Sequence, residues 1–488
     1  MLLVATCAAA LWSTRVVLDS VTPVRKWARD VRYSATEQRR EAARRLGSLT
    51  AEEIKTAVPA LLDAIGDEDE QVAVTAVQSL GSAGQAALRG RDTGSTQVAI
   101  EALTAALKDG RAAVRTAAAK GMRTVVEGDT LETEAAGALT TALSGAMNDP
   151  SDAVRSMSAA ALGSIGAHYT IDPPQALVEA LDGDTSHGVR RASAQSLGRF
   201  RKGRDRVTLA LLRALSVDEP GTRAACDSAL DALRFDKGKP RSAAIVPALI
   251  EALGSRERRA RYHAAAILGE IGPEAAVGIP SLIRMLQEPV NSDRDGLRSD
   301  PASWDPSGQA ALALGRVAPG TRRAHEVIGA LTEVIRAPGL GRRRAMAAEA
   351  LAEFDRKQLE PAVPVLLAVL TETVGIAGPP APSVCMALGR AAPGTPQAGE
   401  AVSALTAVLD SDWEYTRRNA AKALAGFGRQ AGGALPRLRV AAVEGGRPFV
   451  RDAAAAAVAA IEAADGAPSV RGEPINASRT TSGRTDRP

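Results

Sequence analysis

A Leu-Gly pair, or a near equivalent, recurs along almost the whole sequence and closes an Ala-rich stretch each time. Clear copies stand at Leu46-Gly47, Leu80-Gly81, Leu162-Gly163, Leu197-Gly198, Leu268-Gly269, Leu314-Gly315 and Leu388-Gly389, and degenerate copies at Lys120-Gly121, Leu230-Asp231, Leu351-Ala352 and Leu424-Ala425. From Gly47 to Ala425 the ten intervals average about 38 residues, the spacing expected for solenoid repeats made of two helices. A period of this length means that the 488 residues form one string of similar units, rather than the roughly three globular domains that length alone favours.

Each unit carries the apolar pattern of two amphipathic helices. In the unit near Ala243 the first helix is marked by Ile245, Leu249, Ile250 and Leu253, and the second by Ala264, Ile267, Leu268 and Ile271. The second set falls at i, i+3, i+4 and i+7, on one helical face. Only 3% of the residues are aromatic while 45% are apolar, so Ala and Leu replace a bulky core and all-β folds are nearly excluded. We predict an all-α fold, an α-solenoid or armadillo-like superhelix of about eleven helix pairs.

Four further elements recur at fixed places in the units: a first-helix proline, an Asp in the turn, a Val-Arg pair opening the second helix, and a closing Leu-Gly-x-Ile-Gly. Examples are Pro59, Pro247, Pro280, Pro364 and Pro436; Asp149 with Val154-Arg155; Asp184 with Val189-Arg190; and Leu162-Gly163-Ser164-Ile165-Gly166 and Leu268-Gly269-Glu270-Ile271-Gly272. With these elements the chain, over about residues 34–462, resembles the HEAT repeat family, particularly the bacterial variety similar to phycobilin-lyase repeats. The resemblance implies HEAT-type helix pairs whose second helices line a concave face.

An Asp precedes an Arg by six residues in three units, at Asp109 and Arg115, Asp149 and Arg155, and Asp184 and Arg190. This spacing places a carboxylate in each turn beside a guanidinium at the start of the next helix, so stacked repeats can form an Asp/Arg ladder. One unit departs from the pattern, because Ala73 stands where its Arg would be. The ladder is a structural role that needs no ligand.

Residues 1–33 are predicted to be a short hydrophobic segment followed by a basic linker. Met1 to Trp12 is an uninterrupted run of apolar and small residues, shorter than the roughly 20 that a membrane-spanning helix needs. Two interpretations are open: part of a longer membrane anchor, or a hydrophobic helix packed on the first repeat. An anchor would leave the solenoid on the cytoplasmic side, because basic residues follow it; otherwise we expect a soluble cytoplasmic protein. These basic residues are Arg25, Lys26, Arg29 and Arg32.

Two segments interrupt or follow the predicted solenoid of residues 34–462. Residues 291–307 are rich in Asp, Ser, Gly and Pro and predict a loop inserted between the two helices of one repeat. Residues 463–488 lose the apolar period and predict a disordered tail.

The sequence lacks the clusters that catalysis or metal binding needs. Its four histidines share no i, i+4 spacing, and Cys7, Cys226 and Cys385 have no metal-ligand spacing. Nucleophile elbows, phosphate loops and dinucleotide fingerprints are missing. We therefore expect no catalytic residue, no cofactor, no metal and no enzymatic activity. A bilin-lyase-like enzyme is a further alternative, although so few aromatic side chains give little to line a bilin pocket.

Arginine gathers at the starts of the second helices, although the formal net charge is only +4. On a concave face these side chains would form a discontinuous basic stripe, and guanidinium forks suit carboxylate or phosphate recognition. The opposing interpretation is that one Arg per unit belongs to the ladder and that the others are solvated. The candidate partner-binding residues are Arg190, Arg191, Arg223, Arg259, Arg261, Trp304, Arg343, Arg344, Arg417 and Arg418.

These observations predict a monomeric, non-catalytic scaffold that binds a protein partner along the concave face, held at a membrane if the N-terminal run is an anchor. The alternative is a protein that binds nucleic acid or another polyanion through the basic stripe. Sparse aromatic residues offer little for base stacking, and phosphate-driven binding would weaken steeply with salt.

Overall fold

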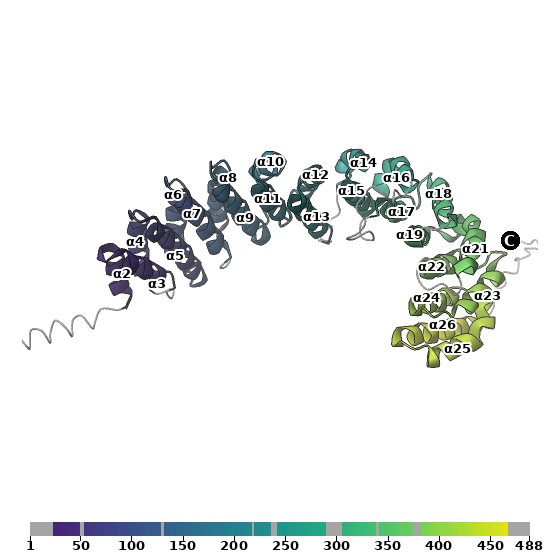
Figure 1. The fold of residues 1–488 in the computed structure, drawn as a ribbon. Coiled ribbons are helices and arrows are strands. Elements are labelled where there is room, and N and C mark those ends of the chain that lie inside the picture. The colour runs from purple at the N-terminus through teal and green to yellow at the C-terminus, as the bar shows by residue number, and fades with distance from the viewer. Residues whose placement is uncertain are drawn as a thin grey trace, which may run out of the picture. The chain divides into compact units, whose positions relative to one another are not determined.

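The computed structural model describes residues 23–48, 53–127, 131–216, 219–235, 242–288, 305–337, 341–373 and 381–466. The described residues contain helices and no strands, and they run as successive helix pairs (Figure 1). The chain divides into two compact units: unit 1 comprises Met1–Ser281 with Ser292–Pro306, and unit 2 comprises Leu282–Asn291 with Ser307–Pro488. The prediction of an all-α solenoid is confirmed, and each unit is described below by itself.

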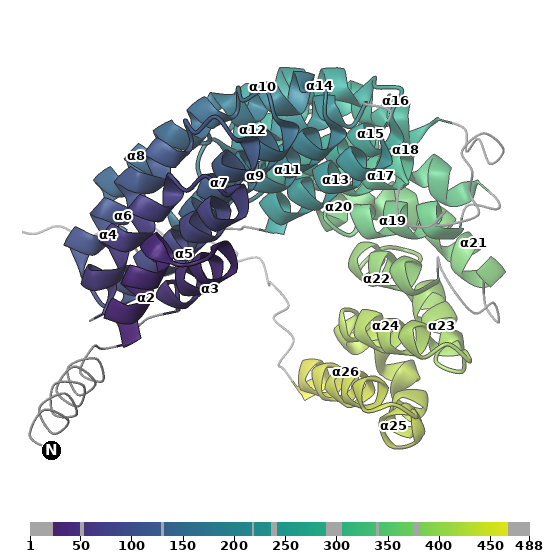
Figure 2. The same ribbon diagram turned by 60° about the vertical axis from the view of Figure 1, so that its left-hand side comes forward.

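In unit 1 a first and a second helix alternate along the chain. The first helices are α2 (Pro23–Tyr33), α4 (Ile54–Ile65), α6 (Thr93–Ala106), α8 (Thr133–Ala146), α10 (Gln175–Gly183), α12 (Arg204–Ala214) and α14 (Val246–Leu253). The second helices are α3 (Thr36–Leu46), α5 (Glu70–Arg89), α7 (Ala112–Val126), α9 (Asp152–His168), α11 (His187–Leu197), α13 (Pro220–Phe235) and α15 (Arg258–Ile271). Within this unit the second helices follow the inner side of the curve and the first helices the outer side (Figure 2).

Unit 2 repeats the same alternation. Its first helices are α16 (Ile279–Leu286), which begins in unit 1, α18 (Ala324–Arg336), α21 (Val363–Thr373), α23 (Ala398–Val408) and α25 (Leu435–Glu444). Its second helices are α17 (Pro306–Val317), α19 (Gly341–Leu351), α22 (Ala381–Ala391), α24 (Glu414–Ala425) and α26 (Pro448–Gly466). Short turns of helix precede three first helices: η1 (Ala243–Ile245), η2 (Gly272–Gly278) and η4 (Gly428–Ala434), while α20 (Arg356–Leu359) and η3 (Glu360–Ala362) lead into α21. The described helices thus form twelve successive pairs, where the sequence predicted about eleven.

Second helices pack on one another through small residues. In α15, Ala264, Ala265, Ile267 and Leu268 are fully buried, as expected for a helix covered on both sides by neighbouring repeats. Ala and Leu also have high helix propensity, so the same residues favour the helix and fill its contacts. Each pair cannot bury both faces alone, and stability therefore depends on stacking.

The Leu-Gly pair proves to be a contact motif rather than a helix stop. In α5 and α9 the helix continues well past Leu80-Gly81 and Leu162-Gly163. A Cβ atom placed on Gly81 would lie 2.5 Å from the Cα atom of Gly121 in the next second helix, a distance that no side chain can occupy. Glycine is needed there because two helices approach closely.

The same contact recurs in both units and fixes the register of the repeats. The glycine after each Leu meets a small residue that precedes the equivalent Leu of the next repeat. The pairs are Gly47 with Ser79, Gly81 with Gly121, Gly163 with Ser196, Gly198 with Ala229, Gly315 with Ala350, and Gly389 with Ala423. Gly121 therefore occupies the small-residue position, so the degenerate copy in α7 is Met122-Arg123 and not Lys120-Gly121.

Some predicted boundaries need correction. The basic stretch predicted as a linker within residues 1–33 is helix α2, which buries Val24, Ala28 and Val31 and packs on α3 and α4. The solenoid therefore begins at Pro23 rather than at residue 34, because this stretch has its own apolar face. At the other end α26 runs to Gly466, beyond the predicted limit of residue 462.

Other predictions fall largely outside the described residues. They include the hydrophobic run of residues 1–12, most of the loop 291–307 and the tail beyond residue 466. Of the loop, Pro306 and Ser307 already belong to α17.

One stretch of the described chain is long and apolar enough to cross a membrane by length and composition, Arg258–Leu286. It covers α15, η2 and α16, and half of its most apolar window is buried, as in a core helix of a stacked fold. It is therefore weak evidence for a membrane span.

Candidate partner-binding surface

In unit 1 the arginines that open helices α3, α7 and α9 form the predicted ladder with carboxylates of the following repeat. Arg115 donates from Nε and Nη2 to the Asp149 carboxylate over 2.6 and 2.9 Å. Arg155 makes the same two bonds to Asp184, at 2.7 and 2.8 Å. In each bidentate pair the two residues are about thirty positions apart in the sequence and belong to neighbouring repeats. The ladder prediction is therefore confirmed here.

Each ladder arginine also closes the turn of its own repeat. Nη1 of Arg115 donates to the Asp109 carbonyl oxygen at 2.9 Å, and Nη1 of Arg155 donates to the Asp149 carbonyl oxygen at 2.9 Å. The Asp side chain meanwhile accepts from the backbone N–H two residues on, as Asp149 does from Ser151 at 2.8 Å. One Asp–Arg set therefore satisfies turn carbonyls, turn N–H groups and two charges at once.

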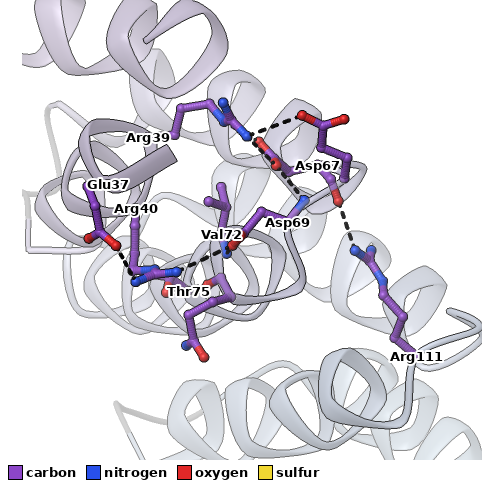
Figure 3. A network of polar contacts seen from close by, with 10 residues as sticks. Glu37, Arg39, Arg40, Asp67, Asp69, Val72, Thr75 and Arg111 are labelled. Carbon is purple, nitrogen blue, oxygen red and sulfur yellow. Dashed lines mark hydrogen bonds and ion pairs between the residues drawn. The ribbon is translucent and has the colours of Figure 1, made fainter. Parts of the chain in front are cut away.

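The first step of the ladder lies between α3 and the turn before α5 (Figure 3). Arg39 donates to both Asp67 carboxylate oxygens at 2.8 and 3.0 Å. Asp69 caps α5 by accepting from the Val72 N–H at 2.9 Å, and Arg40 reaches Asp69 at 3.5 Å.

Arg111, in the turn of the next repeat, takes the place of the ladder arginine that is missing at Ala73. Arg111 reaches back to donate to the Asp67 carbonyl oxygen at 2.8 Å, which is the acceptor that an arginine at position 73 would use (Figure 3). It also makes two bonds to the Asp109 carboxylate, at 2.9 and 3.0 Å. The ladder is thus unbroken although its sequence motif is absent from this repeat.

The pairing shifts the ionisation of both partners. The hydrogen bonds from Arg115 hold the pKa of Asp149 below its usual range, and those from Arg111 do the same for Asp109. Burial alone would raise the pKa of Asp184, but the bonds from Arg155 and the Ser186 N–H bring it below its usual range. The ladder carboxylates are therefore charged at neutral pH and bound to their arginines.

Five of the candidate partner-binding arginines occupy the ladder position, namely Arg190, Arg223, Arg261, Arg344 and Arg417. Nη1 of Arg190 donates to the Asp184 carbonyl oxygen, and Nη1 of Arg261 donates to the Ser255 carbonyl oxygen at 2.8 Å. Arg417 likewise donates to the Ser411 carbonyl oxygen at 2.6 Å. These bonds are those of Arg115 and Arg155, so the guanidiniums serve their own turns.

Arg343 and Arg344 lie inside unit 2, with exposed fractions of 7% and 5%. Arg344 donates from Nε to the Ile335 carbonyl oxygen at 2.7 Å and from Nη2 to Glu372 at 3.1 Å. Arg343 stands where other repeats carry the buried Val of the Val-Arg pair, and its Nη1 donates to the Glu288 carbonyl oxygen at 2.9 Å. Their burial removes both from any surface that a partner could reach without rearrangement.

The remaining candidates differ in their surroundings. Arg259 forms an ion pair with Asp227, whose other oxygen lies 3.3 Å from Nε2 of the buried His263.

The exposure of the other candidates varies. Arg191 is exposed, Arg223 is half-buried, and Trp304 lies outside the described residues. Arg418 is half-buried, with its guanidinium 5.8 Å from the centre of the Phe449 ring. Arg191 and Arg418 are thus the two whose recorded contacts leave them best placed for a partner, and contact with a partner stays a prediction for all ten.

Sequence reasoning missed a cluster of aromatic rings at the starts of α24 and α26. Tyr415 and Phe449 stack with ring centres 5.5 Å apart, and Trp413 meets Tyr415 edge-on at 6.2 Å. The sequence does carry a signal that could have found this cluster. Tyr415 stands two residues before the ladder arginine Arg417, and Phe449 stands two residues before Arg451, so the two rings hold the same position in consecutive repeats.

The described residues hold no group of three or more His, Cys, Asp or Glu side chains that could bind a metal ion. Burial raises the pKa of Cys226 and of Cys385 to about 12, so neither is a thiolate at neutral pH. A hollow of about 600 Å³ opens between the turns before α9 and α11, and the ladder residue Arg155 forms part of its wall. It is therefore a by-product of the ladder turns.

Comparison with protein-family models finds a match for one segment of the chain. Residues 139–231 match the family model of HEAT repeats. This segment is therefore similar to HEAT repeats. It spans helices α8 to α13, where the ladder and the glycine contacts are both present, and the HEAT-type prediction is supported there. The phycobilin-lyase-like subtype stays a prediction.

Solved structures with a similar fold are importins and karyopherins. Importin β in a polyethylene glycol condition has a TM-score of 0.60 at 14% identity, over 90% of this chain and 66% of that chain. Importin β in an ammonium sulfate condition gives 0.52 at 14% identity, over 89% and 62%. Kap121p gives 0.51 at 18% identity, over 92% and 49%. The chain thus spans about half of Kap121p and under two thirds of the second importin β structure, and identities this low show the fold alone. Among curated proteins, none matches the sequence.

Proposed function

We propose that this protein is a non-catalytic scaffold that binds another protein along the second-helix side of its stacked repeats. The observation that carries the proposal is how the polar side chains are used: most arginines at the starts of the second helices bond turn carbonyls and carboxylates of their own solenoid. Such a molecule offers an extended surface of many weak contacts, and a protein partner suits that surface better than a small substrate does.

The comparisons support the proposal at the level of the fold. One further similar structure, with a TM-score of 0.50 at 14% identity, is of Kap95p, whose binding is described as inducing the switch loops of RanGDP to adopt the GTP-bound conformation. Kap95p therefore binds RanGDP. A fold does not fix a function, so the likeness favours the class of partner and not its identity.

The test is affinity capture with the full chain from its native extract, followed by identification of what is retained. We expect a protein that stays bound at moderate salt and whose binding tracks residues on the second-helix side. Capture of nucleic acid alone, with binding that falls about 10³-fold or more between low and moderate salt, would favour the polyanion alternative instead.

Membrane attachment through the N-terminal run is a separate proposal. Its support is the apolar run of residues 1–12 followed by basic residues on α2. Fractionation of the full chain beside a chain that starts at Thr22, which leaves α2 intact, tests it. Both chains in the soluble fraction would exclude the anchor.

A further inference from the structure

The aromatic cluster of unit 2, defined by Trp413, Tyr415 and Phe449, has no counterpart at the same repeat position among the other residues that the structure describes. Tyr415 is the second residue of α24 and Phe449 the second of α26, and both stand two residues before an arginine that closes its own turn. The residues at this position in five repeats of unit 1 are Glu37, Ala113, Ala153, Gly188 and Arg259. Because those repeats fold with polar or small residues at this place, the solenoid does not need rings there.

Tyr415 is the exposed ring of the cluster, while Trp413 and Phe449 are half-buried, in a chain with only 3% aromatic residues. Tyr415 is 54% exposed although it stacks on Phe449 across two repeats. A tyrosine held by a neighbouring ring loses little further freedom when a partner covers it, and such side chains commonly supply most of the binding energy at interfaces.

Charges of both signs flank the rings: Asp412 and Glu414 adjoin Trp413 in the sequence, whereas the charge beside Phe449 is that of Arg418. The Arg418 guanidinium lies 5.8 Å from the Phe449 ring centre, and no carboxylate of the described residues lies within 4.0 Å of it. Arg447, whose side chain is 70% exposed, stands next to the cluster with Glu414 at 3.5 Å. A carboxylate on an incoming segment would therefore meet a guanidinium beside a stacked ring, whereas a lysine or arginine there would be repelled.

We propose that this cluster is the docking point for an extended acidic segment of a partner protein. An aromatic side chain of that segment stacks on Tyr415, and a neighbouring carboxylate pairs with Arg418. The inference rests on the proposed scaffold function and names the chemistry of one of its contacts. The chain's own residues 467–488 are a poor occupant by charge, since they carry four arginines against one Glu and one Asp.

The probe is a displayed library of random short peptides, selected against the full chain and, in parallel, against the double variant Tyr415→Ala with Arg418→Ala. A matched control carries Tyr33→Ala with Arg29→Ala, which removes an exposed tyrosine and an exposed arginine from α2. Thermal unfolding of each protein checks the fold. We expect the full chain and the control to enrich peptides with Phe, Tyr or Trp beside Asp or Glu, and the double variant to bind those peptides about tenfold more weakly.

A second variant keeps the test decisive if the double variant loses stability. Arg418→Glu leaves all three rings in place and reverses the charge beside them, so it should bind the same acidic peptides at least about tenfold more weakly. Enrichment of basic peptides by the full chain, equal binding of acidic peptides by all variants, or no enrichment over the library would each overturn the inference. The scaffold proposal has its own test. If the full chain and the double variant capture a native partner equally, the docking point is wrong but the scaffold function still stands.

Discussion

The repeats of α3, α7 and α9 and the repeats of α24 and α26 use the ladder arginine in different ways. In the first group the guanidinium closes its own turn and also holds a carboxylate of the next repeat, as Arg155 does with Asp184. In the second group Arg417 closes its turn and reaches only a carbonyl, that of Gly445 at 3.4 Å. The turn-closing role is therefore common to both, while the charge pair between repeats is an addition.

This difference separates two roles of the arginine: its bonds to turn carbonyls stabilise a single repeat, and its pair with a carboxylate joins that repeat to the next. In the repeats of α3, α7, α9, α15, α24 and α26 an arginine donates to turn carbonyls, which would otherwise lack that partner. The carboxylate is optional, and where it is absent the surface beside the turn can carry other groups. In unit 2 those groups are the rings of Trp413, Tyr415 and Phe449.

The largest effect should come from the glycine contact that both groups share. Gly81→Ala and Gly389→Ala would each place a Cβ within 2.6 Å of backbone atoms of the next helix, namely the Cα atoms of Gly121 and Ala423. We expect a loss of about 3 kcal/mol in each unit, because neither backbone can yield. Gly145→Ala, with nothing within 4 Å, is the control and should stabilise α8 by about 0.5–1 kcal/mol. Urea unfolding measures all three, and an unchanged Gly81→Ala would refute the close contact.

The next effect tests the comparison directly. Arg155→Ala removes a bidentate pair and two turn-closing bonds, and should cost about 2 kcal/mol, whereas Arg417→Ala removes only bonds to carbonyls and should cost about 1 kcal/mol. Chemical denaturation of both variants gives the two values. Equal losses would mean that the carboxylate adds nothing to the arginine's contribution.

The substitute arginine of unit 1 offers a rescue experiment. Arg111→Ala should lower stability by about 1–2 kcal/mol, since the Asp67 carbonyl oxygen loses this donor and the Asp109 carboxylate keeps only the backbone N–H of residue 111. Adding Ala73→Arg restores an arginine at the ladder position of that repeat and should recover part of the loss. If the double variant is no more stable than Arg111→Ala alone, position 73 and Arg111 are not interchangeable donors.

The smallest effect is the pH dependence of the ladder pairs. Asp109 and Asp149 have a pKa lowered by folding, so their pairs stabilise the fold above the unfolded pKa of about 4 and lose that contribution as pH falls through the folded pKa. Acidification from pH 6 toward pH 3 should therefore speed hydrogen exchange in α7 and α9 more than in α24. The variant Asp149→Asn should show less of this acid response in α7 and α9, and an equal response in α24 would contradict the ladder as its source.

Much of the repeat could be predicted from sequence because its signals are local. The spacing of Asp and Arg by six residues lies within one turn and helix start, and the helix pairs follow from apolar periodicity. The register of α7 could not be predicted, since Lys120-Gly121 resembles the motif and only the contact between Gly81 and Gly121 shows that Met122 holds the Leu position. The burial of Arg343 could not be predicted for a similar reason. The run Arg342 to Arg344 is typical of a solvated surface, yet Arg343 occupies the position of the buried Val in other repeats.

The sequence by itself determined that this protein is a string of helix pairs with a recurring Leu-Gly pair and a recurring Asp–Arg spacing, because those features repeat and depend on neighbours within one unit. Only the tertiary structure decided which acceptor each arginine meets, because the partners lie in a neighbouring repeat, 34 residues ahead for Arg115 with Asp149 and 44 residues back for Arg111 with Asp67. It also brought Tyr415 of α24 onto Phe449 of α26. Stacking one repeat on the next is the physical step that sequence spacing does not encode.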